Sequence, residues 1–377
     1  MHKLNTMAHT NLVVAKKAQN DEFYTQYPDI QKEVNAYLEY NPDVFRGKTI
    51  LLPCDDPEWS NFTKFFAQNF ENFGLKKLIS TSFAVESKKY KTDWQPTLFE
   101  TENPLFNLDK SKRCGKIFVL DHDTNANGKI DIDDLQWQYL EGDGDFRSDE
   151  VKLLRDEADI IVTNPPFSLF REFLAWLVET DKRFLIIGNK NCISYKEVFP
   201  LIKANRIWAG RTEWSGGMWF YTNPTNEDND SLSNVASCWF TNIDHGRRHQ
   251  PLQLMSMADN IKFSSHKEVR GGKYFHYENY DAIEVPYTDA IPSDYDGVMG
   301  VPITFLEKYC PEQFEIVGIG NGGELGISYG ISANLSADDC KRLFKEDKGF
   351  RRGKLCYRDE TGRLISCYAK ILIRKKQ

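Results

Sequence analysis

Residues 159–170 read "DIIVTNPPFSLF" and place a run of β-branched residues directly before an Asn, two prolines and a Phe. The apolar run predicts a buried strand. Two consecutive prolines fix φ, lack backbone N–H groups and keep the preceding residue out of the helical region. We therefore expect the strand to end at Asn164 in a stiff turn whose polar groups point in set directions.

The segments on either side alternate between apolar strands and amphipathic helices. Helices are expected at residues 28–40, 61–74, 150–158 and 168–180, and strands at residues 48–54, 76–83, 116–120, 135–140 and 183–189. Continuous apolar strands joined by helical crossovers predict an α/β fold with a doubly wound, mostly parallel sheet covered on both faces. Ligands bind beyond the carboxyl ends of the strands in such a sheet, where Asn164 falls.

Composition limits the class of protein. A chain of 377 residues that is 41% hydrophobic is long enough to bury at least one large core. No apolar run approaches the roughly 18 residues that cross a bilayer, and the N-terminus lacks a signal-peptide pattern, so we expect a cytoplasmic protein without membrane partners. Eight cysteines without a C-x-x-C pair indicate neither a zinc ribbon nor a disulfide framework.

The charge is uneven along the chain. The net charge of −7 gives no overall attraction to nucleic acid, yet residues 341–377 contain thirteen Lys or Arg against four acidic residues. Such a tail is either a solvated face or a surface that contacts phosphates. The polar stretch "DHGRRHQ" (residues 244–250) precedes a change in composition, and we place a boundary there, between residues 1–245 and a smaller region at 246–377.

The tetrapeptide "NPPF" suggests a specific chemistry. The side-chain oxygen of Asn164 and the carbonyl of Pro165 would form two acceptors for an exocyclic NH₂, turning its lone pair toward an electrophile. Phe167 supplies a flat ring on which a planar amine can stack. The alternative is a Pro-Pro turn with a buried Phe and an Asn that caps the next helix. The position at the carboxyl end of a parallel strand favours the functional interpretation.

At this point the sequence resembles a known family, the S-adenosylmethionine-dependent amino-group methyltransferases that carry an Asn/Asp-Pro-Pro-aromatic motif. It is specifically similar to the EcoRI-type adenine-specific DNA methyltransferases. The resemblance covers nearly the whole chain and rests on segments such as "CDDPEWSNFTKFF", "GDGDFRS", "VTNPPFSLFRE" and "FLIIGNKNCISYKEVF". It implies a Rossmann-like catalytic and cofactor-binding domain over residues 1–245 and a DNA-recognition region over residues 246–377.

The resemblance also implies an activity and its residues. The enzyme would be of the restriction-modification type and would methylate N6 of an adenine flipped out of double-stranded DNA. The catalytic turn would consist of Asn164, Pro165, Pro166 and Phe167. The cofactor would contact the N-terminal residues Phe23, Tyr24 and Thr25, the first cofactor loop after strand one, and Asp145 and Phe146, which would flank its adenine.

The first cofactor loop departs from the family pattern, in which glycines let the backbone approach the cofactor. The segment "CDDPEWSN" (residues 54–61) has no glycine, so its side chains are expected to reach the cofactor, an ammonium group being a natural partner for a carboxylate. The alternative is that these residues only cap the next helix. The candidates are Cys54, Asp55, Asp56 and Ser60. The acidic residue that the family pattern places at the end of the second strand, for the ribose hydroxyls, is missing from "LISTSF" (residues 78–83), and Glu86 is only a guess for that role.

A second motif, "DTNANGKIDIDDL" (residues 123–135), has the spacing of an EF-hand loop, so a calcium site there is one of two interpretations. Oxygen side chains occupy positions 1, 3, 5 and 12 of the loop, namely Asp123, Asn125, Asn127 and Asp134. The expected flanking strands instead favour an ordinary hairpin turn. Asp at position 12, in place of Glu, would also weaken a calcium site.

Other functions stay open. The same turn could serve methylation of an RNA base or a protein glutamine, and a non-catalytic DNA- or calcium-binding protein could keep the fold. The intact segment 164–167 argues against a non-catalytic protein, and the Phe with the long C-terminal region favours DNA. Candidate sequence readers are "RTEWSGGMWFYTNP" (residues 211–224) and the basic tail. We expect a monomer or weak dimer.

Overall fold

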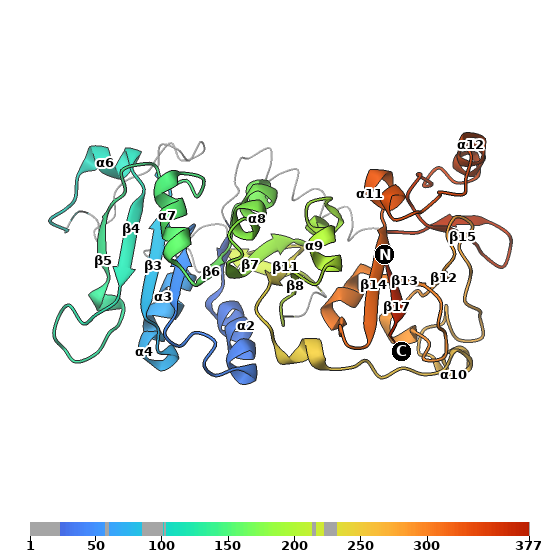
Figure 1. The fold of residues 1–377 in the computed structure, drawn as a ribbon, viewed down its shortest axis with the longest axis horizontal. Coiled ribbons are helices and arrows are strands. Elements are labelled where there is room, and N and C mark those ends of the chain that lie inside the picture. Colours follow the sequence, from blue (N-terminus) through green and yellow to red (C-terminus); the bar gives the residue numbers. More distant parts are fainter. Residues whose placement is uncertain are drawn as a thin grey trace. The chain divides into compact units, whose positions relative to one another are not determined.

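The computed structural model describes residues 23–56, 60–84, 101, 103–212, 216–221 and 232–376 (Figure 1). The chain divides into two compact units, one made of Met1–Lys190 and Ala209–His245 and the other of Asn191–Trp208 and Gly246–Gln377. The catalytic and DNA-recognition roles assigned to residues 1–245 and 246–377 stay predictions. In the described part of the chain, no helix is long and apolar enough to cross a membrane.

An eight-stranded mixed sheet is central to the first unit, with the order β5-β4-β3-β2-β6-β7-β11-β8. The α/β class is therefore confirmed. The strands are β2 (Thr49–Leu52), β3 (Lys77–Ser82), β4 (Lys116–Leu120), β5 (Gln136–Tyr139), β6 (Ile160–Thr163), β7 (Arg183–Asn189), β8 (Trp208–Ala209) and β11 (Ser237–Thr241).

The prediction of a mostly parallel sheet is correct for the four central strands and wrong for their neighbours. β3, β2, β6 and β7 are parallel to one another. β4 is antiparallel to β3, β5 to β4 and β11 to β7. The reason lies in the connections, because β4 and β5 are joined by residues 121–135, a link that contains only a short 3-10 helix and no crossover α-helix.

The strand order reverses between β2 and β6. From β2 the chain continues outward to β3, and from β6 it continues outward in the opposite direction to β7. A reversal of this kind in an open α/β sheet is the point beyond which ligands bind, at the carboxyl ends of the strands. These ends are Leu52, followed by residues 53–56, and Thr163, followed by Asn164.

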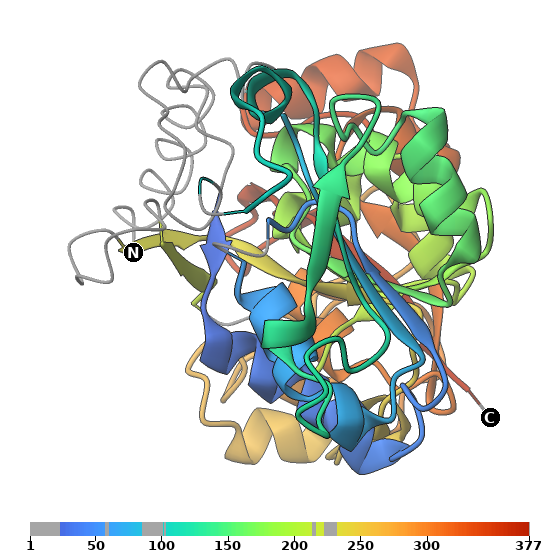
Figure 2. The same cartoon turned by 90° about the vertical axis from the view of Figure 1, so that its left-hand side faces the viewer.

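Helices cover both faces of this sheet. They are α2 (Tyr27–Tyr40), α3 (Asn61–Gln68), α4 (Phe70–Phe73), α7 (Asp149–Glu157) and α8 (Phe170–Val178), with α6 (Leu108–Arg113) before β4. In Figure 2 the blue helices α2 and α3 lie on one side of the sheet and the green helices α7 and α8 on the other. Alternate residues of the central strands, such as Ile50, Leu52, Ile160 and Val162, pack with α2 and α3 in one buried cluster.

The single helix expected at residues 61–74 is broken at Asn69. Its side-chain Nδ2 donates to the carbonyl of Phe65 at 2.8 Å, and its φ of −107° and ψ of 13° depart from helical values. Asn readily forms such local bonds to the backbone, which compete with the helix. Gly74 ends α4 with φ of +61°, the left-handed cap that glycine favours.

A small antiparallel sheet completes the first unit. It consists of β1 (Tyr24–Thr25), β9 (Met218–Tyr221) and β10 (Leu232–Val235), in the order β1-β9-β10. Phe220 and Met218 are buried in the same cluster as the face of α2 and α3. The pairing of β1 with β9 holds residues 24 and 25 in an extended conformation.

The second unit contains a four-stranded sheet in the order β12-β13-β17-β14 and a hairpin of β15 and β16. The strands are β12 (Ile283–Glu284), β13 (Met299–Pro302), β14 (Phe314–Gly320), β15 (Cys356–Arg358), β16 (Leu364–Ser366) and β17 (Lys370–Lys375). The helices are α9 (Phe199–Lys203), α10 (Met257–Phe263), α11 (Gly323–Ser328) and α12 (Ala337–Glu346). β17 is antiparallel to both of its neighbours.

Candidate active site

Asn164 lies directly after β6 and has one engaged and one available polar atom. Its Nδ2 donates to the main-chain oxygen of Phe23 at 2.6 Å. Because a carbonyl can only accept, this contact fixes which end of the amide is nitrogen. Its Oδ1 is buried and receives no hydrogen bond from the described residues. Leaving a buried acceptor unpaired costs about 1–3 kcal/mol, so Asn164 presents an acceptor suited to an incoming N–H.

Phe167 is half-buried and belongs to an aromatic cluster with Phe23 and Phe220. Its ring stacks on Phe23 with a centroid distance of 5.4 Å and an interplanar angle of 26°. Phe220 meets it edge-on at 6.2 Å. Phe23 therefore occupies part of the ring surface that was expected to receive a base. Stacking of a base on Phe167 stays a prediction.

Asp55 connects the ends of the two strands that flank the reversal. Its Oδ2 accepts a hydrogen bond from Thr163 Oγ1 at 2.6 Å, and its Oδ1 accepts one from Ser60 Oγ at 2.7 Å. Thr163 is the last residue of β6 and precedes Asn164. Ser60 also caps α3 by accepting from the N–H of Phe62, so capping and carboxylate binding occur together. The candidate cofactor loop is thus hydrogen-bonded to the residue that precedes the candidate catalytic turn.

The backbone around Asp55 is held by the neighbouring strand β3. The N–H of Asp55 donates to the carbonyl of Thr81 at 3.0 Å, and the hydroxyl of Ser80 donates to the carbonyl of Asp55. Thr81 Oγ1 donates to the carbonyl of Pro53 at 3.0 Å. Hydrogen bonds from β3 therefore fix the backbone of this loop. Its side chains project from that fixed backbone and stand where the family pattern has glycines.

The carboxyl of Asp55 is only 6% exposed and is not paired with a Lys or Arg among the described residues. Burial raises its pKa to about 7, while hydrogen bonds from Thr163 and Ser60 partly oppose that rise. A buried carboxyl is stable as a charged group only when a cation or several donors compensate it. A positively charged group of a ligand could therefore compensate the charge of the Asp55 carboxylate.

Two side-chain amides clamp the N-terminal strand β1 at this edge. Asn164 Nδ2 binds the carbonyl of Phe23, and Asn61 Nδ2 binds the carbonyl of Thr25 at 2.8 Å. Asn61 is the first residue of α3, immediately after Ser60. The expected contact residues 23–25 are thus brought to the catalytic turn and to the cofactor loop. Tyr24 pairs with Tyr221 of β9.

Asp145 and Phe146 follow β5 on a loop that reaches the end of β3. The N–H of Ala84 donates to the carbonyl of Asp143 at 2.7 Å, and a Cβ on Gly144 would lie 2.3 Å from the carbonyl oxygen of Ser82. Only glycine permits that close approach. The loop is therefore next to the strand beside β2, which is consistent with a place near the cofactor.

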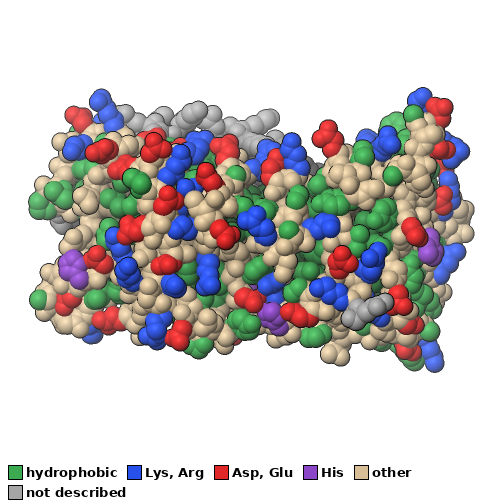
Figure 3. All heavy atoms as spheres, in the orientation of Figure 1, with side chains coloured by type: hydrophobic (Ala, Val, Ile, Leu, Met, Phe, Trp, Pro, Cys, Tyr) green, Lys and Arg blue, Asp and Glu red, His purple; other side chains and the backbone are tan. Residues whose placement is uncertain are grey.

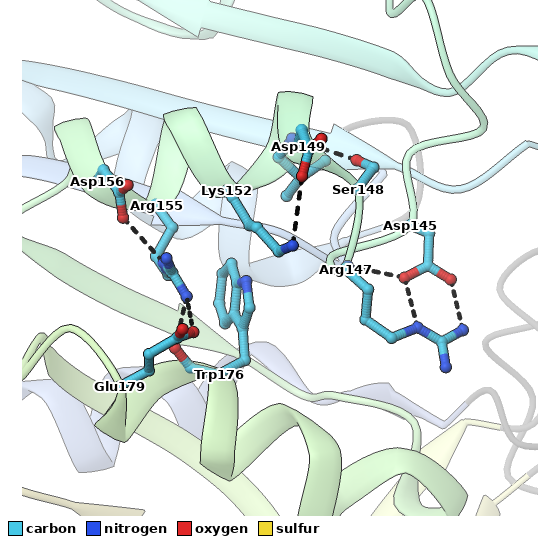
Figure 4. Close-up of polar contacts among 10 residues, drawn as sticks. Asp145, Arg147, Ser148, Asp149, Lys152, Arg155, Asp156, Trp176 and Glu179 are labelled. Carbon is cyan, nitrogen blue, oxygen red and sulfur yellow. Dashed lines mark hydrogen bonds and ion pairs between the residues drawn. The ribbon is translucent and has the colours of Figure 1, made fainter.

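The side chains of this pair point to different neighbours. Figure 4 shows Asp145 facing Arg147, whose Nη2 and Nε lie 2.6 and 2.9 Å from the two carboxylate oxygens. The hydrogen bonds from Arg147 hold the pKa of Asp145 below its usual value. Phe146 is buried against Phe173 and Trp176 of α8. The contacts of Asp145 and Phe146 with the cofactor stay predictions, as do those of Cys54 and Asp56.

The predicted calcium loop is closed by its own hydrogen bonds. Asp134 Oδ1 accepts from the N–H and hydroxyl of Thr124 and from the N–H of Asn125, and Oδ2 accepts from the N–H of Asp131. Asp123 accepts from the N–H groups of residues 127 and 128. Within the described ranges no group of three or more His, Cys, Asp or Glu residues could hold a metal. Calcium binding stays a prediction.

Sequence reasoning missed Thr163, Asn61 and Phe220. The sequence assigns Thr163 only to an apolar strand, and it assigns Asn61 only to the end of the loop at residues 54–61 and the start of a helix. The position of Thr163 is a usable signal, because polar residues at the carboxyl ends of adjacent parallel strands converge on the ligand side of the sheet. Phe220 gave no such signal, since a strand or a DNA-reading segment would both explain residues 216–221.

Comparisons with known proteins identify the family of the chain. Residues 11–376 match the family described as adenine-specific methyltransferase EcoRI, so the chain belongs to that family of enzymes. It is 42% identical over 319 residues to the Type II methyltransferase M.EcoRI of Escherichia coli, covering 82% of this chain and 88% of that one. It is 35% identical over 316 residues to M.MpnI of Mycoplasma pneumoniae, covering 80% and 83%. No solved structure matches significantly.

Replacing Asp134 by Asn should lower the melting temperature at neutral pH, in calcium and in chelator alike. An amide offers one acceptor oxygen where the loop uses two. Burial acts to raise the pKa of Asp134, but the hydrogen bonds from Asp131 and Thr124 outweigh burial and lower that pKa. Its stabilising effect is therefore present above the ordinary carboxyl pKa of about 4 and is lost as the pH falls through the lower folded pKa. Thermal melts at several pH values measure the difference.

The matched control is Asp133→Asn, which changes an exposed neighbour that caps nothing in the loop. It should leave the melting temperature almost unchanged. If Asp134→Asn destabilises the protein only when calcium is present, the loop is a calcium site and its own hydrogen bonds are not what closes it.

Proposed function

We propose that this adenine-specific methyltransferase transfers the methyl group of S-adenosylmethionine to N6 of an adenine in duplex DNA, with Asn164 holding the amine. The observation that carries the proposal is the buried Oδ1 of Asn164, which no described donor reaches, at the end of β6. An adenine amine offers two N–H donors, and Oδ1 accepts one of them. The carbonyl of Pro165 is the candidate for the second.

Two accepted hydrogen bonds have a chemical effect on the amine. The N6 lone pair of adenine is delocalised into the ring, and it becomes available when both hydrogens are held out of the ring plane. S-adenosylmethionine, when bound, supplies an electrophilic methyl group. Catalysis then consists mainly of alignment, and the amine loses one proton after transfer. The stiff Pro165-Pro166 turn keeps the acceptors in place.

The negative charge of the Asp55 carboxylate is complementary to the positive charge at the amino-acid end of S-adenosylmethionine. Its carboxyl is buried between Thr163 and Ser60 and has no described cationic partner. The amino-acid end of S-adenosylmethionine carries an ammonium group, which would compensate the carboxylate and lower its pKa. Asp55 would therefore bind and orient that end of the cofactor, next to the strand that carries Asn164.

The target must leave the duplex. In double-stranded DNA the adenine amine is paired and stacked, so an enzyme that acts on N6 has to extrude the base into its site. Phe167 is the candidate ring for stacking, on the part that Phe23 leaves uncovered. The relatives' names as Type II methyltransferases support a restriction-modification role and favour DNA over RNA or a protein glutamine.

The substitution Asp55→Asn should have two opposite effects. Since burial raises the folded pKa above the unfolded value of 3.8 to about 7, the buried carboxyl opposes folding increasingly between these pH values. The variant should therefore melt higher than the wild type at pH 8, with a gap that narrows toward pH 4. Loss of the carboxylate should weaken cofactor binding by about 10- to 100-fold. Calorimetry and thermal melts measure both.

Glu39→Gln serves as the matched control, because it removes the same charge from an exposed position of α2 and should leave cofactor binding unchanged. A variant Asp55→Asn that binds the cofactor as tightly as the wild type would exclude the ammonium contact. One that melts lower than the wild type at pH 8 would show that the carboxylate stabilises the free enzyme.

The proposed reaction is tested with unmethylated duplex DNA and isotope-labelled S-adenosylmethionine, followed by nuclease digestion and mass spectrometry of the nucleosides. The wild type should yield N6-methyladenine. Asn164→Ala should abolish it while changing cofactor affinity by no more than a few fold. Asn35→Ala, the same change at an exposed position of α2, should retain full activity.

Other products would decide against the proposal. Label in cytosine, in RNA only or in protein glutamine would show that the turn serves another amine. Wild-type turnover by Asn164→Ala would remove Asn164 from the catalytic site even if N6-methyladenine is the product.

A further inference from the structure

A strongly basic segment lies in the second unit, in a chain of net charge −7. Residues 341–354 contain seven Lys or Arg and two acidic residues. They span most of α12 and the turn that follows it, and are called here the basic segment. Figure 3 shows Lys and Arg side chains around the α12 end of this unit. A charge excess of this size attracts anionic partners locally even when the whole protein is acidic.

Apolar anchors divide the basic segment into an inner and an outer side. Leu343 and Phe350 are buried in a small cluster with Cys356 and Leu364. On the outer side Phe344 is 39% exposed. Lys348 Nζ lies 4.6 Å and the Arg351 guanidinium 5.1 Å from the centroid of its ring. The small core therefore orients the cations outward.

Glycine contacts fix the backbone of the turn. The N–H of Gly322 donates to the carbonyl of Gly353 at 3.0 Å, and that of Gly323 donates to the carbonyl of Arg352 at 2.8 Å. A Cβ on Gly326 would lie 1.9 Å from the oxygen of Gly353, whose own φ is +85°. Only glycines allow two backbones to pack this closely. The turn is thus ordered before any ligand binds, which lowers the entropic cost of binding.

The cations of the segment differ in their partners. Lys341 and Arg342 pair with Asp338 and Asp339 on the same helix. Lys348 and Arg352 are exposed, and no acidic side chain among the described residues forms an ion pair with either. Arg351 donates through Nη1 to two carbonyls of the turn, which leaves other guanidinium donors free.

We propose that the basic segment contacts the phosphate backbone of the DNA duplex on which the enzyme acts, mainly through Lys348, Arg351 and Arg352. The inference rests on the proposed function for its partner. Duplex DNA carries one negative charge per roughly 1.7 Å of its axis, which complements a group of exposed cations on an ordered turn. Such contacts position the protein on the duplex and carry no sequence information by themselves.

The test measures binding of a fluorescently labelled random-sequence DNA duplex by anisotropy at several salt concentrations. The variant is Lys348→Gln with Arg352→Gln, because neither side chain forms a hydrogen bond that holds the turn. Removing two phosphate contacts should reduce the slope of log K against log salt by about 2 and weaken binding by about 10- to 100-fold near 0.1 M salt. Its cofactor affinity and melting temperature should match those of the wild type.

The matched control is Lys267→Gln with Arg270→Gln, which removes the same charge from exposed positions elsewhere in the unit. It should leave the slope unchanged. If both variants have the same slope as the wild type, the proposed phosphate contact is wrong. It is also wrong if both variants lose the same slope and affinity, because the effect would then come from net charge alone. If the wild type methylates no DNA, the proposed function itself fails and this inference with it.

Discussion

The hydrogen bond from Thr163 to Asp55 joins the two halves of the candidate active site. It crosses the point where the strand order reverses, from the end of β6 to the residues that follow β2, with an O–O distance of 2.6 Å. Because Thr163 immediately precedes Asn164, a movement of the Asp55 carboxyl would shift the residue next to the candidate catalytic turn. The charge state of Asp55 and the position of Asn164 are therefore linked.

A second constraint comes from the N-terminal strand. Asn164 Nδ2 donates a hydrogen bond to the carbonyl of Phe23, and Asn61 Nδ2 donates one to the carbonyl of Thr25. β1 is thus part of the site and not only of the small sheet that it forms with β9. Without the Phe23 carbonyl, the amide of Asn164 would be free to rotate, and its Oδ1 would no longer be presented as an unpaired acceptor.

Local features could be predicted from the sequence. The Pro-Pro turn and the apolar strands follow from neighbouring residues, whereas Asp55 became one of four loop candidates through the resemblance to a family. Strand direction at β4 and β5 could not be predicted, since a continuous apolar run suits either direction. Thr163 lies 108 residues from its partner Asp55, and Phe23 lies 141 residues from its partner Asn164, so only the folded chain reveals these two hydrogen bonds. The loop at residues 123–134 was ambiguous because metal sites and tight turns use the same oxygen-bearing side chains.

A structure of the enzyme with a non-reactive cofactor analogue and a duplex containing its methylation site, mapped beforehand, tests the central claim most directly. The account predicts the flipped adenine with N6 about 2.7–3.2 Å from Asn164 Oδ1, while Asn164 Nδ2 remains bonded to the carbonyl of Phe23. The cofactor's ammonium group should lie beside the Asp55 carboxylate. An N6 amine held by other groups, with Asn164 Oδ1 facing away from it, would contradict the account.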